Sequence, residues 1–257
     1  MKRSAQWVLV AALVPSIHAS TADLHEILSA SRDRIQTADY RITGRLVRVE
    51  ANGTRTSENV TVKAHWFPGV LRVLVDVNAP AKAREHVLLE MRPDGEDTIF
   101  IAHPGDHAPV PLPFARWDDG PLGGTFSYED FLEPQYFWPV QIELAPARRG
   151  ARDCSVVKSA PGPIDRTHYA EEKTWLDKTI GFPVYAEKTR KGSGVIKQFT
   201  YYGLRHDGGI WSASQVEAKV AGKDGSTLFI IDRGSAKANL GAKDFSPESM
   251  IHFQGGL

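Results

Sequence analysis

Two histidines and an aspartate lie close together in the chain and could together bind a metal ion. They occupy the stretch His103-Pro-Gly-Asp-His107. A zinc site needs three or four protein ligands held in a fixed geometry. The spacing here is loose, no helix is predicted at this point, and no third histidine lies nearby. We interpret both as surface histidines, and we expect neither a metal site nor a cofactor.

The side chains that hydrolases use are also present, but not in the patterns that catalysis requires. Ser127 lacks the Gly-x-Ser-x-Gly context of a nucleophile elbow. Acidic pairs occur at Asp118-Asp119, Glu129-Asp130 and Glu171-Glu172. The last pair falls in a predicted strand, where neighbouring side chains point to opposite faces. Gly192-Ser-Gly194 precedes no helix whose N-terminus could hold a phosphate. The sequence therefore favours a protein that is not an enzyme.

Aromatic residues are the remaining feature with functional potential, because they gather in the middle of the chain. Most of them are expected to belong to an ordinary core. Trp117, Phe126 and Phe131, however, flank a stretch rich in glycine and proline, where they could line the mouth of a cavity. From position and alternation, we predict that a hydrophobic cavity and its mouth are formed by Trp66, Leu74, Phe100, Trp117, Phe126, Tyr128, Phe131, Trp138 and Val216.

The second half of the chain supplies the elements that would position these residues. Strand-like segments follow one another at regular spacing, and glycine-containing turns separate them. Such spacing predicts an antiparallel meander, and a long meander twists and curls. A curled sheet with one apolar face can enclose a cavity or wrap around a helix. The predicted strands are 168–177, 184–190, 195–202, 211–220 and 227–233.

Alternation within the strands indicates which side chains face inward. The odd-numbered residues from Leu71 to Val77 are all apolar, whereas Arg72 lies on the other face. In the predicted strand 211–220, the even-numbered residues share a face, and several of them are small. A period of two marks half-buried strands. Small inward residues leave room for a helix or a ligand.

The first half of the chain predicts one helix and a second set of strands. Apolar residues recur at helical spacing in 22–38, from Leu24 to Ile35, so this helix has one apolar stripe. We expect that stripe to pack into the concave side of the sheet. Asn52-Gly53 and Asp94-Gly95 are strong hairpin turns. The predicted strands are 40–50, 60–67, 70–77, 86–92 and 98–102.

The connection between the two sets of strands is long and rich in proline. Residues 104–121 contain five prolines, and proline cannot donate the N–H that a central strand requires. We therefore expect a loop or an edge, and we hypothesise that it forms a flap over a cavity. Ser127 is a good N-cap for a short helix that ends at Leu132, and Glu129 and Asp130 suit its first turn.

Composition sets broad limits on the type of protein. The chain has 257 residues, of which 42% are hydrophobic, and its formal net charge is zero. Without a basic excess, nucleic-acid binding is not expected. Cys154 is the single cysteine, so the fold has no internal disulfide. Cys154 lies in a strand-like segment and is interpreted as a buried structural thiol.

The N-terminus has the pattern of a signal peptide. Lys2 and Arg3 precede a short apolar stretch, and small residues follow it. The apolar stretch is shorter than a comfortable transmembrane helix, although an uncleaved anchor is the alternative interpretation. We predict a signal peptide over residues 1–19, with cleavage near Ala19 or Ala22, and one domain over residues 20–257. The expected location is the periplasm.

Several short motifs resemble those of one protein family. Gly124-Thr-Phe-Ser-Tyr-Glu-Asp-Phe131 resembles the family's "fsyeD" segment. Trp175-Leu-Asp-Lys-Thr179, Pro183, Ile196-Lys197 and Asp207-Gly-Gly-Ile-Trp211 resemble its series of hairpins, and Phe245-Ser-Pro247 resembles its closing motif. In order and spacing, residues 24–251 are similar to the outer-membrane lipoprotein-sorting family, in a longer form of the LolA-like carriers.

The resemblance implies a mostly β protein of the α+β class. Its expected fold is a half-open, strongly curved antiparallel β-sheet or barrel, wrapped around or lidded by a few helices. It also implies a non-catalytic periplasmic carrier that binds lipid or lipoprotein acyl chains in the concave face and transfers them towards the outer membrane. An inner-membrane transporter and an outer-membrane acceptor are the expected partners, and the carrier is expected to be a monomer.

Two other hypotheses remain open at this point. The first alternative is a periplasmic lipid-sensing or accessory binding module that works with an inner-membrane export or regulatory protein. The second is a hydrolase whose site is not visible in the sequence. Transfer of an acyl ligand to acceptor membranes would separate a carrier from a binding module.

Overall fold

Antiparallel strands make up most of the protein in the computed structural model, which describes residues 21–121, 125–207 and 209–252. The predicted signal peptide lies outside these residues. The strands are β1 (Asp39–Val49), β2 (Arg55–Phe67), β3 (Val70–Ala79), β4 (Glu85–Met91), β5 (Thr98–Ala102), β6 (Val110–Pro111), β7 (Val140–Arg149), β8 (Arg152–Ala160), β9 (Tyr169–Asp177), β10 (Pro183–Arg190), β11 (Ile196–Tyr202), β12 (Arg205–Asp207), β13 (Ile210–Ser212), β14 (Gln215–Val220) and β15 (Ser226–Ser235).

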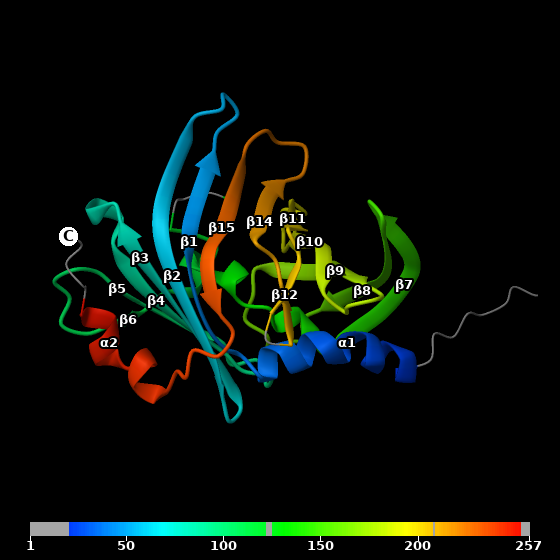
Figure 1. Ribbon diagram of the computed structural model, residues 1–257, viewed down its shortest axis with the longest axis horizontal. Coiled ribbons are helices and arrows are strands. Elements are labelled where there is room, and N and C mark those ends of the chain that lie inside the picture. Colours follow the sequence, from blue (N-terminus) through cyan, green and yellow to red (C-terminus); the bar gives the residue numbers. More distant parts are fainter. Residues whose placement is uncertain (1–20, 122–124, 208, 253–257) are drawn as a thin grey trace, which may run out of the picture.

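One sheet of 13 strands contains all of these except β12 and β13, which form a separate hairpin. Its order is β6-β5-β4-β3-β2-β1-β15-β14-β11-β10-β9-β8-β7. The sheet curls without closing, because its outermost strands, β6 and β7, do not pair with one another (Figure 1). The predicted half-open, strongly curved antiparallel sheet is therefore confirmed.

The first and last strands of the chain meet in the middle of this sheet. β1 pairs along its whole length with β2 on one side, and from Arg41 to Val49 with β15 on the other. The β1–β15 register shifts at Gly44, where an added Cβ would lie 2.1 Å from the carbonyl oxygen of Ile230. Glycine is required there because the two backbones approach too closely for any side chain.

Two helices flank the sheet in the described part of the chain. α1 (Thr21–Gln36) confirms the predicted N-terminal helix and runs along one end of the half-barrel (Figure 1). Its residues Leu28 and Ile35 enter the main hydrophobic core, as the apolar stripe predicted. α2 (Pro247–Ile251) lies on the outer side against β4 and β5. No described helix has both the length and the apolar character needed to cross a membrane.

The two faces of the sheet carry different cores. The odd-numbered residues of β3, from Leu71 to Val77, belong to the large core on the concave side, as predicted. Leu74 belongs instead to a small cluster on the opposite face. There it packs with Phe245 and Met250, which the C-terminal segment lays over that face. Cys154 is fully buried and unpaired, in agreement with the structural role predicted for it.

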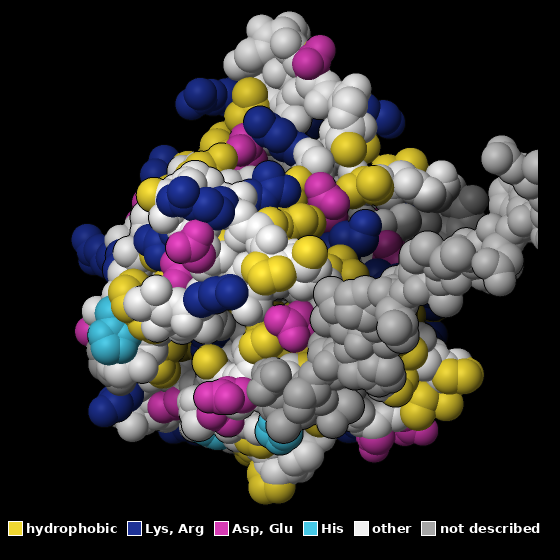
Figure 2. Space-filling view, turned by 90° about the vertical axis from the view of Figure 1, so that its right-hand side faces the viewer, with side chains coloured by type: hydrophobic (Ala, Val, Ile, Leu, Met, Phe, Trp, Pro, Cys, Tyr) yellow, Lys and Arg dark blue, Asp and Glu magenta, His cyan; other side chains and the backbone are white. Residues whose placement is uncertain are grey.

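Most of the other predicted elements are found, but β2 begins at Arg55 rather than near residue 60, and β7 was not predicted. A 3₁₀ helix covers Tyr128–Phe131, where the short helix was expected. The strand predicted over 211–220 is divided into β13 and β14, because the chain leaves the main sheet at Tyr202 and returns only at Gln215. Basic and acidic side chains are interspersed over the face in Figure 2, in keeping with the net charge of zero.

Candidate functional site: an apolar cavity on the concave face

A cavity of about 460 Å³ lies on the concave side of the sheet. One wall is the sheet itself, and the opposite wall is the segment 125–138, which crosses the concave side and is called here the crossing segment. The hairpin β12–β13 and the end of α1 complete the enclosure. The apolar residues of the lining include Ile42, Val62, Phe126, Phe131, Leu132, Phe182, Phe199, Ile210, Trp211, Val216, Phe229 and Ile231.

Strand alternation explains why these side chains face the cavity. Phe199 and Tyr201 are two residues apart on β11, and Phe229 and Ile231 are two apart on β15, so each pair shares a face. Val216 of β14 lies directly opposite both Tyr201 and Phe229 in the sheet register. The register therefore aligns these inward residues as one continuous surface.

Phenylalanine rings form the inner part of this surface. The ring centroid of Phe126 lies 5.0 Å from that of Phe131, 5.9 Å from that of Phe199 and 6.3 Å from that of Phe229. Their tilted and edge-to-face arrangements are the favoured geometries of aromatic pairs. Two of the rings come from the crossing segment and two from the sheet, so the cluster also holds the segment against the sheet.

Polar contacts fasten the crossing segment to the sheet on both sides of this cluster. The backbone N–H of Thr125 donates a hydrogen bond to Thr227 Oγ1 at 3.0 Å. The hydroxyl of Tyr128 donates to Glu85 Oε1 at 2.8 Å. Because these partners lie on β15 and β4, the segment bridges strands that are far apart in the sheet order.

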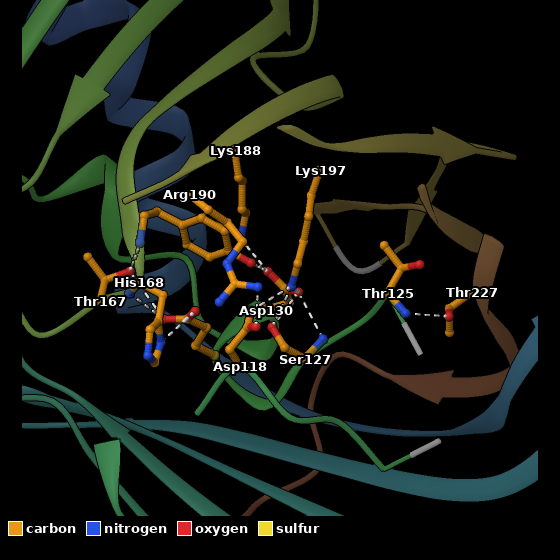
Figure 3. Close-up of polar contacts among 12 residues, drawn as sticks. Asp118, Thr125, Ser127, Asp130, Thr167, His168, Lys188, Arg190, Lys197 and Thr227 are labelled. Carbon is orange, nitrogen blue, oxygen red and sulfur yellow. Dashed lines mark hydrogen bonds and ion pairs between the residues drawn. The ribbon is translucent and has the colours of Figure 1, made fainter. Parts of the chain in front are cut away.

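The strongest of these attachments is at Asp130, whose side chain is fully buried. Lys188 Nζ lies 3.2 Å from its Oδ1, and Lys197 Nζ lies 3.1 Å from its Oδ2. Figure 3 shows both lysines extending from their strands towards this carboxylate. Tyr169 donates its hydroxyl to Oδ1 at 2.7 Å, and Ser127 donates both its backbone N–H and its hydroxyl to Oδ2.

The two lysines determine the protonation of this carboxylate. Burial alone would raise the pKa of Asp130, but the charges of Lys197 and Lys188 outweigh it and hold that pKa well below its usual range. Burial would likewise lower the pKa of Lys188, yet Asp130 and Glu172 raise it overall. Both groups are therefore charged at neutral pH.

For Glu172, which lies next to Lys188, burial outweighs the effect of the neighbouring charge on the pKa. It lies 3.8 Å from Lys188 Nζ and is the register partner of that lysine on β9. Burial is the largest influence and, despite the lysine, raises the pKa of Glu172 to about 7. Glu171, its neighbour, is partly exposed, as the alternation argument predicted for this acidic pair.

Further ion pairs surround Asp130. Arg190 and Lys197 both contact Asp118, at 2.6 Å and 3.3 Å (Figure 3). Glu129 accepts hydrogen bonds from the Thr167 hydroxyl and the His168 backbone N–H. Each of these charged groups thus has an ion-pair or hydrogen-bond partner, which is the condition for keeping charges in a low-dielectric interior.

This arrangement does not form a nucleophilic site. Ser127 lies 3.0 Å from Lys197 Nζ, a distance that would suit a Ser–Lys pair. Its hydroxyl, however, donates to Asp130 and is fully buried, and Lys197 lies between the carboxylates of Asp118 and Asp130. Among the described residues, no group of three or more histidine, cysteine, aspartate or glutamate side chains could hold a metal ion.

Three of the nine residues predicted to form a ligand cavity line it. They are Phe126, Phe131 and Val216. Leu74 and Phe100 are on the opposite face of the sheet, in the cluster that α2 covers, so the structure does not bring them to the cavity. The alternation in β3 already separated Leu74 from the inward residues of that strand.

The other four predicted residues pack in the core beside the cavity. Trp66 stacks on Phe137, with ring centroids 6.4 Å apart. Trp117 is buried and donates its indole N–H to the carbonyl oxygen of Leu112. Tyr128 and Trp138 are also buried, at the two ends of the crossing segment. The proline-rich segment 104–121 does not line the cavity and so does not occupy the flap position expected for it; β6 joins the sheet edge instead.

The lining also contains residues that were not predicted. Phe199, Phe229 and Ile231 occupy inward positions of strands that were predicted correctly. Their alternation was the available signal, although in 227–233 apolar residues occupy both faces. Lys188 and Lys197 are inward-facing charges, and nothing within either strand indicates that a single aspartate neutralises both.

Comparison with known proteins agrees with this architecture. A family model with the description "-like: Uncharacterized protein" matches residues 70–252. No curated protein matches the chain in sequence. A solved outer-membrane lipoprotein-sorting protein domain from Vibrio parahaemolyticus is similar to it, with a TM-score of 0.79 and 18% identity over 91% of this chain and 100% of that chain.

Two further solved structures share the fold. A DUF1329 family protein from Desulfovibrio piger has a TM-score of 0.76 at 14% identity, over 88% of this chain and 98% of that chain. A LolA superfamily protein from Nitrosomonas europaea has a TM-score of 0.67 at 16% identity, again over 88% and 98%. The resemblance drawn from the sequence motifs is confirmed at the level of the fold. The chain belongs to the family whose model covers residues 70–252, and its fold is that of the LolA-like outer-membrane lipoprotein-sorting proteins.

Proposed function

We propose that this protein is a non-catalytic carrier that binds lipid or lipoprotein acyl chains in its concave cavity and transfers them across the periplasm towards the outer membrane. The observation that supports this most directly is the apolar cavity of about 460 Å³ beneath the crossing segment. Its volume falls within the range of about 300 to 1,000 Å³ that is typical of small-molecule sites.

The energetics of an acyl chain fit such a cavity. Removing one methylene group from water contributes about 0.8 kcal/mol, so a sixteen-carbon chain gains on the order of 13 kcal/mol before costs are subtracted. A membrane offers the same gain. A carrier must therefore match it with apolar surface of its own, such as Phe199, Phe229 and Ile231 provide. No catalytic group is needed for that task.

The chain's other predicted properties complete the proposal. The predicted signal peptide over residues 1–19, with cleavage near Ala19 or Ala22, would deliver the domain of residues 20–257 to the periplasm as a monomer. Loading and release then require an inner-membrane transporter and an outer-membrane acceptor, because a cavity alone gives transfer no direction.

A cavity-filling substitution tests the proposal. Val216→Trp places a large side chain among the lining residues, whereas Val140→Trp makes the same change on β7, where Val140 is exposed. The variants would be compared by titration with the uncharged fluorescent probe N-phenylnaphthylamine and by mass spectrometry of co-purified lipid. We expect Val216→Trp to lose probe binding and bound lipid, and Val140→Trp to retain both. Equal binding by both variants would contradict the proposal.

One observation favours the alternative, a lipid-sensing or accessory binding module. The crossing segment is fastened at Thr125, Tyr128 and Asp130, so releasing it requires several buried contacts to break. A module that retains its ligand would benefit from such fastening. Transfer of a fluorescent acyl lipid from the loaded protein to acceptor vesicles separates the two functions: transfer supports a carrier, and stable retention supports the binding module.

A further inference from the structure

One end of the cavity contains an ion pair between two different elements. Arg34 of α1 binds Glu133 of the crossing segment through two hydrogen bonds of 2.8 and 2.9 Å. Both side chains line the cavity. In this bidentate geometry each charge neutralises the other. The pair therefore presents polar atoms to the cavity without presenting a net charge.

Two tyrosine hydroxyls lie close to this ion pair. Tyr40 of β1 and Tyr201 of β11 both line the cavity, and the charges of Arg34 and Glu133 act on both phenols. Neither hydroxyl has a hydrogen-bond partner among the residues that the structure describes. Burial raises the pKa of Tyr40 to about 12, so this phenol is protonated and able to donate.

A buried amide supplies a third polar group at the same place. Gln135 is only 2% exposed and lines the cavity. Its side-chain oxygen Oε1 is buried and has no hydrogen-bond partner in the described structure. Leaving such a group without a partner is unfavourable, and a bound molecule that supplied the missing hydrogen bond would be stabilised by doing so.

The charges around these groups distinguish between ligand types. Arg34 is neutralised by Glu133, and Lys188, the other cation facing this part of the cavity, is held by Asp130. A carboxylate or phosphate placed here would find no unpaired cation and would lie beside the carboxylate of Glu133. An uncharged group that accepts and donates hydrogen bonds meets no such penalty.

We propose that Tyr40, Tyr201 and Gln135 form a subsite for the uncharged hydrogen-bonding group of an acyl lipid, such as an ester, an amide or a hydroxyl. This inference rests on the proposed function, because it assumes that the acyl chain occupies the apolar part of the same cavity. The phenylalanine cluster at Phe126, Phe131, Phe199 and Phe229 then receives the hydrocarbon chain.

A competing arrangement would place an anionic head group against a different cation, Arg205. Arg205 of β12 also lines the cavity, but it is exposed and has no ion pair among the described residues. A ligand with an anionic head group would place that group against Arg205, at the hairpin rather than beside the ion pair. The two arrangements predict different ligand preferences and different sensitive residues.

Competition experiments on the full chain can separate them. Displacement of N-phenylnaphthylamine would be measured with 1-lauroylglycerol, which is uncharged, and with laurate, which is anionic at pH 8. We expect 1-lauroylglycerol to bind at least tenfold more tightly than laurate. The double variant Tyr40→Phe/Tyr201→Phe should lose about tenfold in affinity for 1-lauroylglycerol, since it removes two hydrogen bonds to the ligand. Its affinity for the uncharged probe should be unchanged, which also verifies that the variant is folded.

Tyr202→Phe is the matched control, because Tyr202 is the next residue on β11, is exposed, and donates to Glu217 outside the cavity. It should not change either affinity. Equal affinity for the two lipids, or no effect of the double variant, would overturn the subsite and leave the carrier proposal intact. Tighter binding of laurate that Arg205→Gln abolishes would overturn it in favour of an anionic head group. Failure of both the probe and the lipids to bind would instead refute the proposed function.

Discussion

Lys188 and Lys197 lie directly opposite one another on β10 and β11, and both side chains end on the carboxylate of Asp130. Two like charges at facing positions of an antiparallel pair destabilise a sheet when nothing separates them. Here they form a binding site for one residue of the crossing segment. The pair therefore makes the sheet dependent on that segment, and it fixes the segment that forms a wall of the cavity.

The first prediction concerns this dependence. Asp130→Asn keeps the shape of the side chain but leaves two buried ammonium groups without their shared counter-charge. We expect the free energy of unfolding in urea to fall by about 3 to 5 kcal/mol, the usual cost of breaking a buried ion pair. Asp232→Asn is the control, because its salt bridge with Arg45 is exposed and contributes about 1 kcal/mol or less. Similar losses in the two variants would contradict this role of Asp130.

The second prediction concerns pH. The folded protein holds Glu172 with a pKa of about 7, whereas the ordinary value is 4.5, so between these values the folded state binds a proton that the unfolded state has released. The contribution of this residue is therefore present at low pH and is lost as the pH rises through about 7.

Urea unfolding at several pH values between 4.5 and 8 would measure this loss. Glu172→Gln should flatten the decline in the free energy of unfolding across that range, because glutamine stays neutral. Glu171→Gln, on the other face of the same strand, should leave the pH dependence unchanged. If the free energy of unfolding of both variants depends on pH as it does in the original protein, burial of Glu172 does not govern its ionisation.

The third prediction concerns the packing contact between α1 and the turn that joins β9 to β10. Gly181 has a positive φ of 64°, and an added Cβ would lie 2.6 Å from the Cβ of Ala30. Gly192 also has a positive φ but nothing within 4 Å. Alanine should therefore cost about 1 to 2 kcal/mol at residue 192 and about 1 to 3 kcal/mol more at residue 181, by thermal or urea unfolding. Equal losses in the free energy of unfolding at the two residues would show that α1 can move aside without an energetic penalty.

The fourth prediction concerns the outer cluster. Leu74 is fully buried against Phe245 and Met250, so Leu74→Ala should lower the free energy of unfolding by about 2 to 5 kcal/mol. Because this cluster is on the face of the sheet away from the cavity, the affinity for N-phenylnaphthylamine should stay within about twofold. A larger change in affinity would mean that α2 and the cavity are coupled through the sheet.

Local patterns were sufficient to predict most of the fold. Asn52-Gly53 and Asp94-Gly95 adopt the positive glycine φ that their hairpins need, and the period of two placed Leu71 to Val77 on the inner face. α1 was evident from its apolar stripe. These features depend on residues a few positions apart, so one sequence contains the information that they require.

The cavity was harder to predict because it depends on distant residues meeting. Asp130 suited the first turn of a short helix, but its two lysine partners are 58 and 67 residues further along the chain. Their meeting is set by the register of β10 and β11 and by the path of the crossing segment, and neither is visible in local periodicity. Leu74 lies outside the cavity for a different reason: its hydrophobic side chain suits either face of the sheet, and the alternation of β3 places it on the outer one.

The position of β15 next to β1 has a consequence for how the chain acquires its structure. Arg41 of β1 faces Ser235 of β15, so the central ladder joins residues from nearly opposite ends of the described chain. Contacts between residues so far apart in sequence slow folding, because a long loop must close before they form. Hairpins on either side of β15 can form early. The two halves of the sheet are joined only when β15 pairs with both β1 and β14. A chain interrupted before Ser226 would lack both ladders that β15 forms, with β1 and with β14, and these are what join the two halves of the sheet.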